Sequence, residues 1–305
     1  MQQMTWTPGA WASTIRAIEI EISAHCNWRC VFCPVHSDPK PQATMDLQLF
    51  QEILAKATAL PNAKLVTFNS YNEPTVCEHF DAMLRLLNET RLKLILHTNA
   101  TRLDARRIAF LAQTGLAAAV IVNLPSLDPV RFRALTGVPT LEKSLAAVEQ
   151  AISAGLPVRL SVNGTLADQA ENFPALRARF GARVIEDRSS DRAGLLRGDY
   201  AQGISIAGPL RGCDLVDEWV HIAVNGDLYI CCEDYHQKEV YGNIRDGGLE
   251  AVLATPRALE LRRRVFGIED APADFICRRC DKMLVQCSQH RAGPGHNTQP
   301  VRPTH

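Results

Sequence analysis

The residues in this chain best able to do chemistry are its cysteines, three of which lie close together. Cys26, Cys30 and Cys33 form a C-x3-C-x2-C triplet. Three thiolates at this spacing can hold three irons of a four-iron cluster and leave the fourth iron without a protein ligand. An open iron can bind a substrate or a cofactor. The alternatives are three unrelated core cysteines or a zinc knuckle, for which His36 could supply the fourth ligand.

A second group of four cysteines comes from two distant parts of the chain. It comprises Cys213, Cys231 and the C-x2-C pair Cys277 and Cys280. Four thiolates can ligate every iron of a cluster, and this leaves no iron open for a substrate. The same residues could instead form a zinc ribbon that only fastens the tail of the chain.

The elements that must position the triplet are short β-type runs alternating with amphipathic helices. Several of these runs are apolar almost throughout, as is typical of parallel strands covered by helices. Six βα units fall short of the eight that close a full barrel, so we predict an α/β fold with a partial (β/α)6 barrel over residues 1–190. The triplet directly follows the first run, where such barrels place their chemistry. The six predicted strands are 17–23, 64–70, 92–98, 117–123, 157–163 and 182–187.

A smaller second module is predicted after the barrel. Residues 191–212 are interpreted as a linker, because glycines and charged residues interrupt the periodicity there. Residues 213–290 are predicted to form an α+β module with a hairpin turning at Asn225-Gly226. Thr255 and Pro256 have the residue types of a helix N-cap and first helical position. The Pro- and Gly-rich residues 291–305 are expected to be disordered.

Composition excludes several classes of partner. The chain of 305 residues has 33 Lys and Arg against 33 Asp and Glu, so no net field draws it to nucleic acid or to a membrane surface. It has no apolar run of about 18 residues and no signal-peptide pattern. We therefore expect a cytoplasmic protein, in which ten cysteines are better interpreted as metal ligands or catalytic thiols than as disulfides.

The triplet at the end of a first strand resembles the radical S-adenosylmethionine (SAM) superfamily, and the resemblance covers about residues 15–190. It implies that Cys26, Cys30 and Cys33 hold a [4Fe-4S] cluster whose open iron chelates SAM. It also implies an electron donor such as flavodoxin or ferredoxin, and reductive cleavage of SAM to a 5′-deoxyadenosyl radical.

Further positions along the barrel match SAM-binding motifs of that family. The run 70–74, SYNEP, looks like a variant of the Gly-Gly-Glu-Pro motif, although Tyr71 and Asn72 replace its small residues. An aromatic residue precedes the third cysteine, and polar residues follow the third, fourth and fifth strands. The resemblance thus implies SAM contacts from Phe32, Asn72, Glu73, Asn99, Asn123 and Asn163.

The C-terminal module resembles the twitch, or truncated SPASM, extension of radical SAM enzymes. In that extension one auxiliary [4Fe-4S] cluster lies between the hairpin and the C-x2-C pair, so the resemblance implies a cluster on Cys213, Cys231, Cys277 and Cys280. The full SPASM module carries more cysteines and two clusters. Here only Cys287 follows the pair, so one auxiliary cluster is predicted.

Three functions are compatible with these sequence features. The first is epimerisation of an amino sugar, an aminocyclitol or a short peptide, with Cys232 as the hydrogen donor because it adjoins Cys231. The second is two-electron oxidation, or cross-linking, with the auxiliary cluster as electron acceptor and a base such as Asp187. The third is an iron-sulfur scaffold that has lost SAM chemistry. Only some 16 residues precede the first strand, which favours a small molecule or a short peptide over a substrate held by a leader-binding domain.

Overall fold

The structure is a computed structural model that describes residues 10–185 and 190–283. The predictions made for Asp187, for Cys287 and for the tail 291–305 lie outside these ranges.

A single open sheet of nine strands organises the fold, in the order β6-β5-β4-β3-β2-β1-β7-β8-β9. The first six strands follow chain order and pair in parallel, which confirms the predicted partial barrel. The strands are β1 (Ala17–Ile20), β2 (Leu65–Thr67), β3 (Lys93–Thr98), β4 (Ala117–Asn123), β5 (Val158–Ser161), β6 (Val184–Ile185), β7 (Trp219–Ile222), β8 (Asp227–Tyr229) and β9 (Val240–Asn243).

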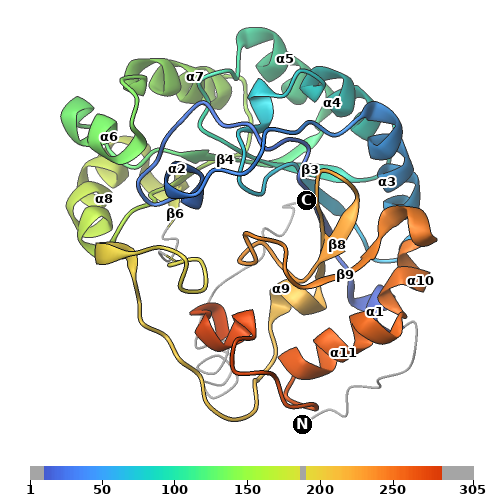
Figure 1. Cartoon of the computed structure of the whole chain (residues 1–305). Coiled ribbons are helices and arrows are strands. Elements are labelled where there is room, and N and C mark those ends of the chain that lie inside the picture. Colours follow the sequence, from blue (N-terminus) through green and yellow to red (C-terminus); the bar gives the residue numbers. More distant parts are fainter. Residues whose placement is uncertain (1–9, 186–189, 284–305) are drawn as a thin grey trace.

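The longer helices between the parallel strands cover the outer face of those strands, as Figure 1 shows. Each has an apolar stripe that packs inward, as in α3, where Phe50, Ile53 and Leu54 are buried. This arrangement explains why β1 is buried along its whole length. These helices are α3 (Leu47–Ala59), α4 (Phe80–Asn88), α5 (Ala105–Thr114), α6 (Pro129–Thr136), α7 (Leu141–Ser153) and α8 (Leu166–Phe180).

The other helices connect and complete these elements. Thr255 caps α11 as predicted, because its side chain accepts a hydrogen bond from the Ala258 amide, and Pro256 is the first helical residue. The remaining α-helices are α1 (Ala10–Thr14), α2 (Pro34–Ser37), α9 (Asp214–Asp217), α10 (Leu249–Leu253) and α11 (Pro256–Val265). The 3-10 helices are η1 (Pro74–Val76), η2 (Gly181–Arg183), η3 (Gly198–Tyr200), η4 (Ile244–Asp246) and η5 (Ile276–Arg279).

The C-terminal hairpin is continuous with the barrel sheet. Strands β7 and β8 form the predicted hairpin, with Gly226 at a φ of +90° in the turn. Strand β7 also pairs in parallel with β1, with Glu19 opposite His221. Cys231, which follows β8, is therefore carried on an extension of the sheet whose first strand leads into the cysteine triplet.

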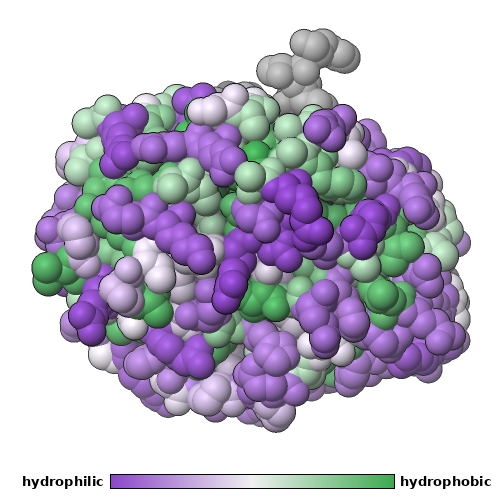
Figure 2. All heavy atoms as spheres, turned by 90° about the horizontal axis from the view of Figure 1, so that it is seen from above, coloured by the Kyte–Doolittle hydropathy of each residue, from purple (hydrophilic) through white to green (hydrophobic). Residues whose placement is uncertain are grey.

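The outer surface is mixed in polarity. On the face drawn in Figure 2, hydrophilic side chains predominate and hydrophobic ones are interspersed among them. No helix in the described ranges has the length and apolar composition needed to cross a bilayer.

Candidate functional site

The cysteine triplet lies in the loop that follows β1. Cys30 is buried, and Cys26 and Cys33 are half-buried. The Cys33 amide donates to the Cys30 carbonyl at 3.1 Å, and the Trp28 amide donates to the Cys26 sulfur at 3.5 Å. The loop therefore folds back on itself and gathers its three thiols.

The end of helix α6 holds this loop in place. The amides of Arg29 and Val31 donate to the carbonyls of Thr136 and Leu135 at 2.9 and 3.0 Å. The ring of Trp28 meets that of Phe132, which lies in α6, edge to face at 5.2 Å. The helix that follows β4, three strands away from β1 in the sheet, thus fixes the position of the cysteines.

The three thiols open onto one cavity at the carboxyl ends of the parallel strands. Its volume of about 350 Å³ is within the range of small-molecule sites. The structure brings to this cavity every residue for which a SAM contact is predicted, namely Phe32, Asn72, Glu73, Asn99, Asn123 and Asn163.

Glu73 joins the loops after β2 and β3. Its Oε1 accepts hydrogen bonds from the hydroxyls of Thr75 and Thr98 at 2.5 and 2.6 Å, and its Oε2 accepts one from the Asn99 amide at 2.5 Å. Burial raises the pKa of this carboxyl even though these donors oppose the rise. Oε2 keeps capacity for a further donor, such as an amino group.

Asn99 joins the second of these loops to the cysteine loop. Its Nδ2 donates to Asn27 Oδ1 at 2.8 Å, one residue from Cys26. Farther along the sheet, Asn163 Nδ2 donates to Asn123 Oδ1 at 3.1 Å. The polar residues around the cavity therefore orient one another as well as lining it.

The three thiols fit a bound cluster. Burial raises the pKa of Cys26 to about 12 and also raises the pKa values of Cys30 and Cys33. The charges of its two partners raise the pKa of Cys30 further. Buried thiolates that repel one another need a cation between them, and cluster irons supply that charge.

The second cysteine group surrounds a separate, smaller cavity. Cys213 caps α9, Cys231 follows β8, and Cys277 and Cys280 lie in and just after η5. All four are buried and line this cavity together with Leu215, Val216, Ile276 and Met283. Burial raises the pKa of each thiol, so this group also needs cationic compensation. No three His, Cys, Asp or Glu side chains in the described ranges are arranged to hold a single metal ion.

Consecutive cysteines face the two cavities. Cys231 lines the smaller cavity, and Cys232 lines the larger one beside the triplet. Glu233 and Lys282 reach both. Cys232 therefore lines the larger cavity and is one residue from a member of the second group.

Several cavity residues are not predicted from the sequence. Glu19 is 4% exposed on β1 and lines the cavity, with its Oε1 3.3 Å from Nδ1 of His221. The sequence does contain one sign of such a residue. Glu19 and Glu21 interrupt an otherwise apolar strand, and carboxylates are rarely buried without a role. Asn69, His97, Ser161, Arg192, Trp219, Glu233 and Lys282 also line the cavity.

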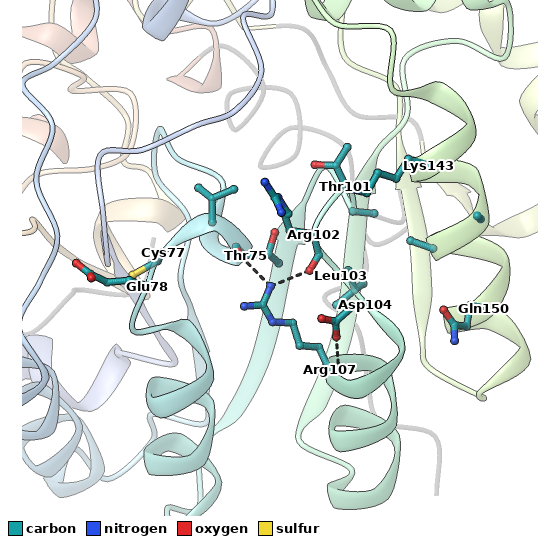
Figure 3. Close-up of a pocket in the computed structure, with 14 residues that line it drawn as sticks. Thr75, Cys77, Glu78, Thr101, Arg102, Leu103, Asp104, Arg107, Lys143 and Gln150 are labelled. Atoms are coloured by element: carbon teal, nitrogen blue, oxygen red, sulfur yellow. Dashed lines mark hydrogen bonds between the residues drawn. The ribbon is translucent and has the colours of Figure 1, made fainter.

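Another cavity lies on the outer side of the barrel, between η1, α5 and α7 (Figure 3). Arg107 points across it and is bound by the carboxylate of Asp81 and the carbonyls of Thr75 and Arg102. Cys77 is at its wall and is 3% exposed. None of the residues of either cysteine group lines this cavity, so Cys77 is separate from both. Asp214, the first residue of α9, is exposed.

Comparison with known proteins gives two family matches. Residues 20–172 match the radical SAM superfamily. Residues 213–281 match the SPASM family, an iron-sulfur cluster-binding domain. The cofactors of this chain are therefore SAM, a [4Fe-4S] cluster and an auxiliary iron-sulfur cluster.

Individual relatives match along most of the chain. An SAM-dependent 2-deoxy-scyllo-inosamine dehydrogenase of Niallia circulans is 21% identical over 89% of this chain and 95% of its own. The structure of BtrN in complex with AdoMet and 2-DOIA matches 88% of this chain and 93% of its own, with a TM-score of 0.61 and 20% identity. Streptococcus suis SuiB bound to precursor peptide SuiA matches 89% of this chain and 70% of its own, with a TM-score of 0.63 and 17% identity. The two structures support the fold.

Proposed function

Because the chain belongs to the radical SAM superfamily, we propose that it epimerises a carbon centre in an amino sugar, an aminocyclitol or a short peptide. The observation that carries this proposal is the place of Cys232. Cys232 lines the same cavity as the cysteine triplet and the residues that are predicted to contact SAM. A thiol there is placed to return a hydrogen atom to a substrate bound in that cavity.

Cys26, Cys30 and Cys33 would hold the SAM cluster, and Cys213, Cys231, Cys277 and Cys280 the auxiliary one. When bound, the SAM cluster and SAM supply a carbon-centred radical able to remove hydrogen from an unactivated C–H bond. The chain's own task is to orient the substrate carbon and exclude water. Polar groups such as Glu19, Asn69 and Ser161 line the cavity and can bind substrate hydroxyls, amines or amides.

The role of Cys232 follows from hydrogen balance. The substrate loses a hydrogen atom from one face, and the S–H bond of Cys232 breaks to form a new C–H bond on the other face. The sulfur is then one hydrogen atom short. An electron from a reduced flavodoxin- or ferredoxin-type donor and a proton must restore the thiol before the next turnover.

A second candidate is two-electron oxidation of a substrate alcohol to a ketone. It is favoured by the similarity to a dehydrogenase along nearly the full length of both chains. This reaction needs a base for the hydroxyl proton. Asp187 lies outside the described residues, but the buried Glu19 carboxyl lines the cavity and could serve in this role.

Product mass separates the two reactions. Holoprotein would be incubated anaerobically with SAM, dithionite and a probe set of 2-deoxy-scyllo-inosamine, related aminoglycosides and short peptides. Epimerisation gives 5′-deoxyadenosine and a product of unchanged mass, whereas oxidation gives a product lighter by two hydrogens. Under our proposal the Cys232→Ala variant still forms 5′-deoxyadenosine but no epimer. A Cys232→Ala variant as productive as the wild type would overturn the proposal.

A further inference from the structure

Tyr71 occupies a position where the SAM-binding motif of the radical SAM superfamily has a small residue. It lies in the loop between β2 and η1, two residues before Glu73, and it is 7% exposed. Tyr71 is one of the residues that line the larger cavity. A tyrosine at this position occupies space that a small residue would leave open to SAM, so its side chain is expected to have another role.

The Tyr71 hydroxyl reaches across the cavity to the second module. It donates a hydrogen bond of 2.6 Å to the carbonyl of Cys232. This bond joins the SAM-motif loop directly to Cys232, which lines the same cavity. Fixing this carbonyl fixes the Cys232–Glu233 peptide plane, and with it the backbone that carries the Cys232 side chain.

Neighbouring side chains hold the Tyr71 ring in position. The ring of Tyr235 meets it edge to face at 4.6 Å. The Lys40 ammonium and the Arg192 guanidinium lie over it, 5.8 and 5.7 Å from its centroid. These distances are within the range of favourable cation–π contact. The hydroxyl is therefore held by a packed ring and does not project on a mobile side chain.

The side chain of the residue after Cys232 is held by two cationic side chains. Glu233 pairs with Arg192 at 3.4 Å and with Lys282 at 3.5 Å. Arg192 and Ala193 both adopt positive φ angles, +54° and +52°, which cost energy for residues other than glycine. The backbone is therefore strained at Arg192, whose side chain contacts both the Tyr71 ring and Glu233. Strained backbone conformations are typical of functional sites.

We propose that Tyr71 is a positioning residue that holds the Cys232 thiol in line with the SAM-binding loop. Tyrosine at this position, where the motif of the family has a small residue, then links the SAM-binding loop to the second module. The inference rests on the proposed function only in naming Cys232 as the hydrogen donor. A tyrosine that merely fills space would do so equally well without its hydroxyl.

The test is Tyr71→Phe, which keeps the ring and its contacts and removes only the hydrogen bond. The matched control is Tyr235→Phe, since the Tyr235 hydroxyl donates to the Asp38 carbonyl and has no bond to Cys232. Iron content and SAM binding of both holoproteins should equal those of the wild type, which checks folding. The first readout is the rate at which iodoacetamide alkylates Cys232 in SAM-bound holoprotein, followed by peptide mass spectrometry. This readout needs no substrate.

We expect Tyr71→Phe to raise the Cys232 alkylation rate about fivefold, the scale of one neutral hydrogen bond, and Tyr235→Phe to leave it unchanged. The second readout uses a probe that the wild type epimerises. The ratio of epimer to 5′-deoxyadenosine should fall by a similar factor in Tyr71→Phe, while the rate of 5′-deoxyadenosine formation stays near that of the wild type.

The positioning role would be overturned if Tyr71→Phe showed the same alkylation rate and the same product ratio as the wild type. An epimerising Cys232→Ala variant would instead overturn the proposed function. In that case the alkylation rate would still decide whether Tyr71 holds the Cys232 segment, so the two failures are distinguishable.

Discussion

At the scale of single residues, Gly137 shows how closely the cysteine loop is packed. It follows α6 with a φ of +75°. A Cβ atom there would lie 3.0 Å from both Cβ and the carbonyl oxygen of Arg29, in the cysteine loop. Glycine is therefore required twice at this position, once for its backbone angle and once for the close approach of the loop.

Gly137→Ala should destabilise the protein and weaken the hold on the SAM cluster. Gly155→Ala is the matched control, because Gly155 has a φ of +79° but a Cβ atom there would meet no neighbouring segment within 4 Å. The control should lose about 1 to 2 kcal/mol for the backbone angle, and Gly137→Ala about 1 to 3 kcal/mol more for the overlap.

Urea titrations of the holoproteins, with iron retained after gel filtration as a second readout, would measure this difference. Equal losses of stability and iron in the two variants would mean that the contact with Arg29 does not hold the loop.

The ligand candidates could be predicted because their signals are local. A triplet of cysteines, or Glu73 followed by proline, is visible within a few positions of sequence. Arg192 and Lys282 line the cavity from segments that contain no motif. Nothing in the local sequence therefore identified them as cavity residues. In the sequence Tyr71 is only a departure from the motif, and the structure alone reveals its bond to Cys232.

At the scale of elements, the apolar pattern predicted the barrel strands to within a few residues at their ends. It did not predict that β7 would pair with β1. Such pairing joins residues some 200 positions apart in the chain, and an apolar strand carries no mark of its partner. The hairpin turn at Asn225-Gly226 was predictable because turn chemistry is local.

The elements that carry the two cysteine groups lead to a prediction about iron content. The triplet comes from one loop, whereas the second group comes from α9, the end of β8 and η5. The two sites should therefore load separately, with about eight irons per wild-type chain and about four in Cys277→Ala/Cys280→Ala. Replacing Cys26, Cys30 and Cys33 by alanine should also leave about four.

Metal analysis of anaerobically reconstituted protein, with sulfide determined alongside, would check these values. A double variant that lost all its iron would contradict separate loading of the two sites.

At the scale of the whole molecule, one sheet brings distant parts of the chain to one cavity. The cysteine loop follows β1, and the Cys231-Cys232 pair follows β8, two strands away in the sheet. Because β7 continues the barrel sheet, the second module closes the side of the site that a six-stranded barrel alone would leave open. The proposed reaction depends on this closure, since Cys232 reaches the cavity from the second module.

The central claim, that Cys232 returns hydrogen to the substrate, is tested most directly by the origin of that hydrogen. Thiol hydrogens exchange with solvent, so wild-type protein turning over in D2O should place one deuterium on the inverted carbon of the product. The Cys77→Ala variant should do the same, because Cys77 lies away from both cysteine groups, and Cys232→Ala should yield no deuterated epimer. An epimer without deuterium, or a deuterated one from Cys232→Ala, would contradict the account.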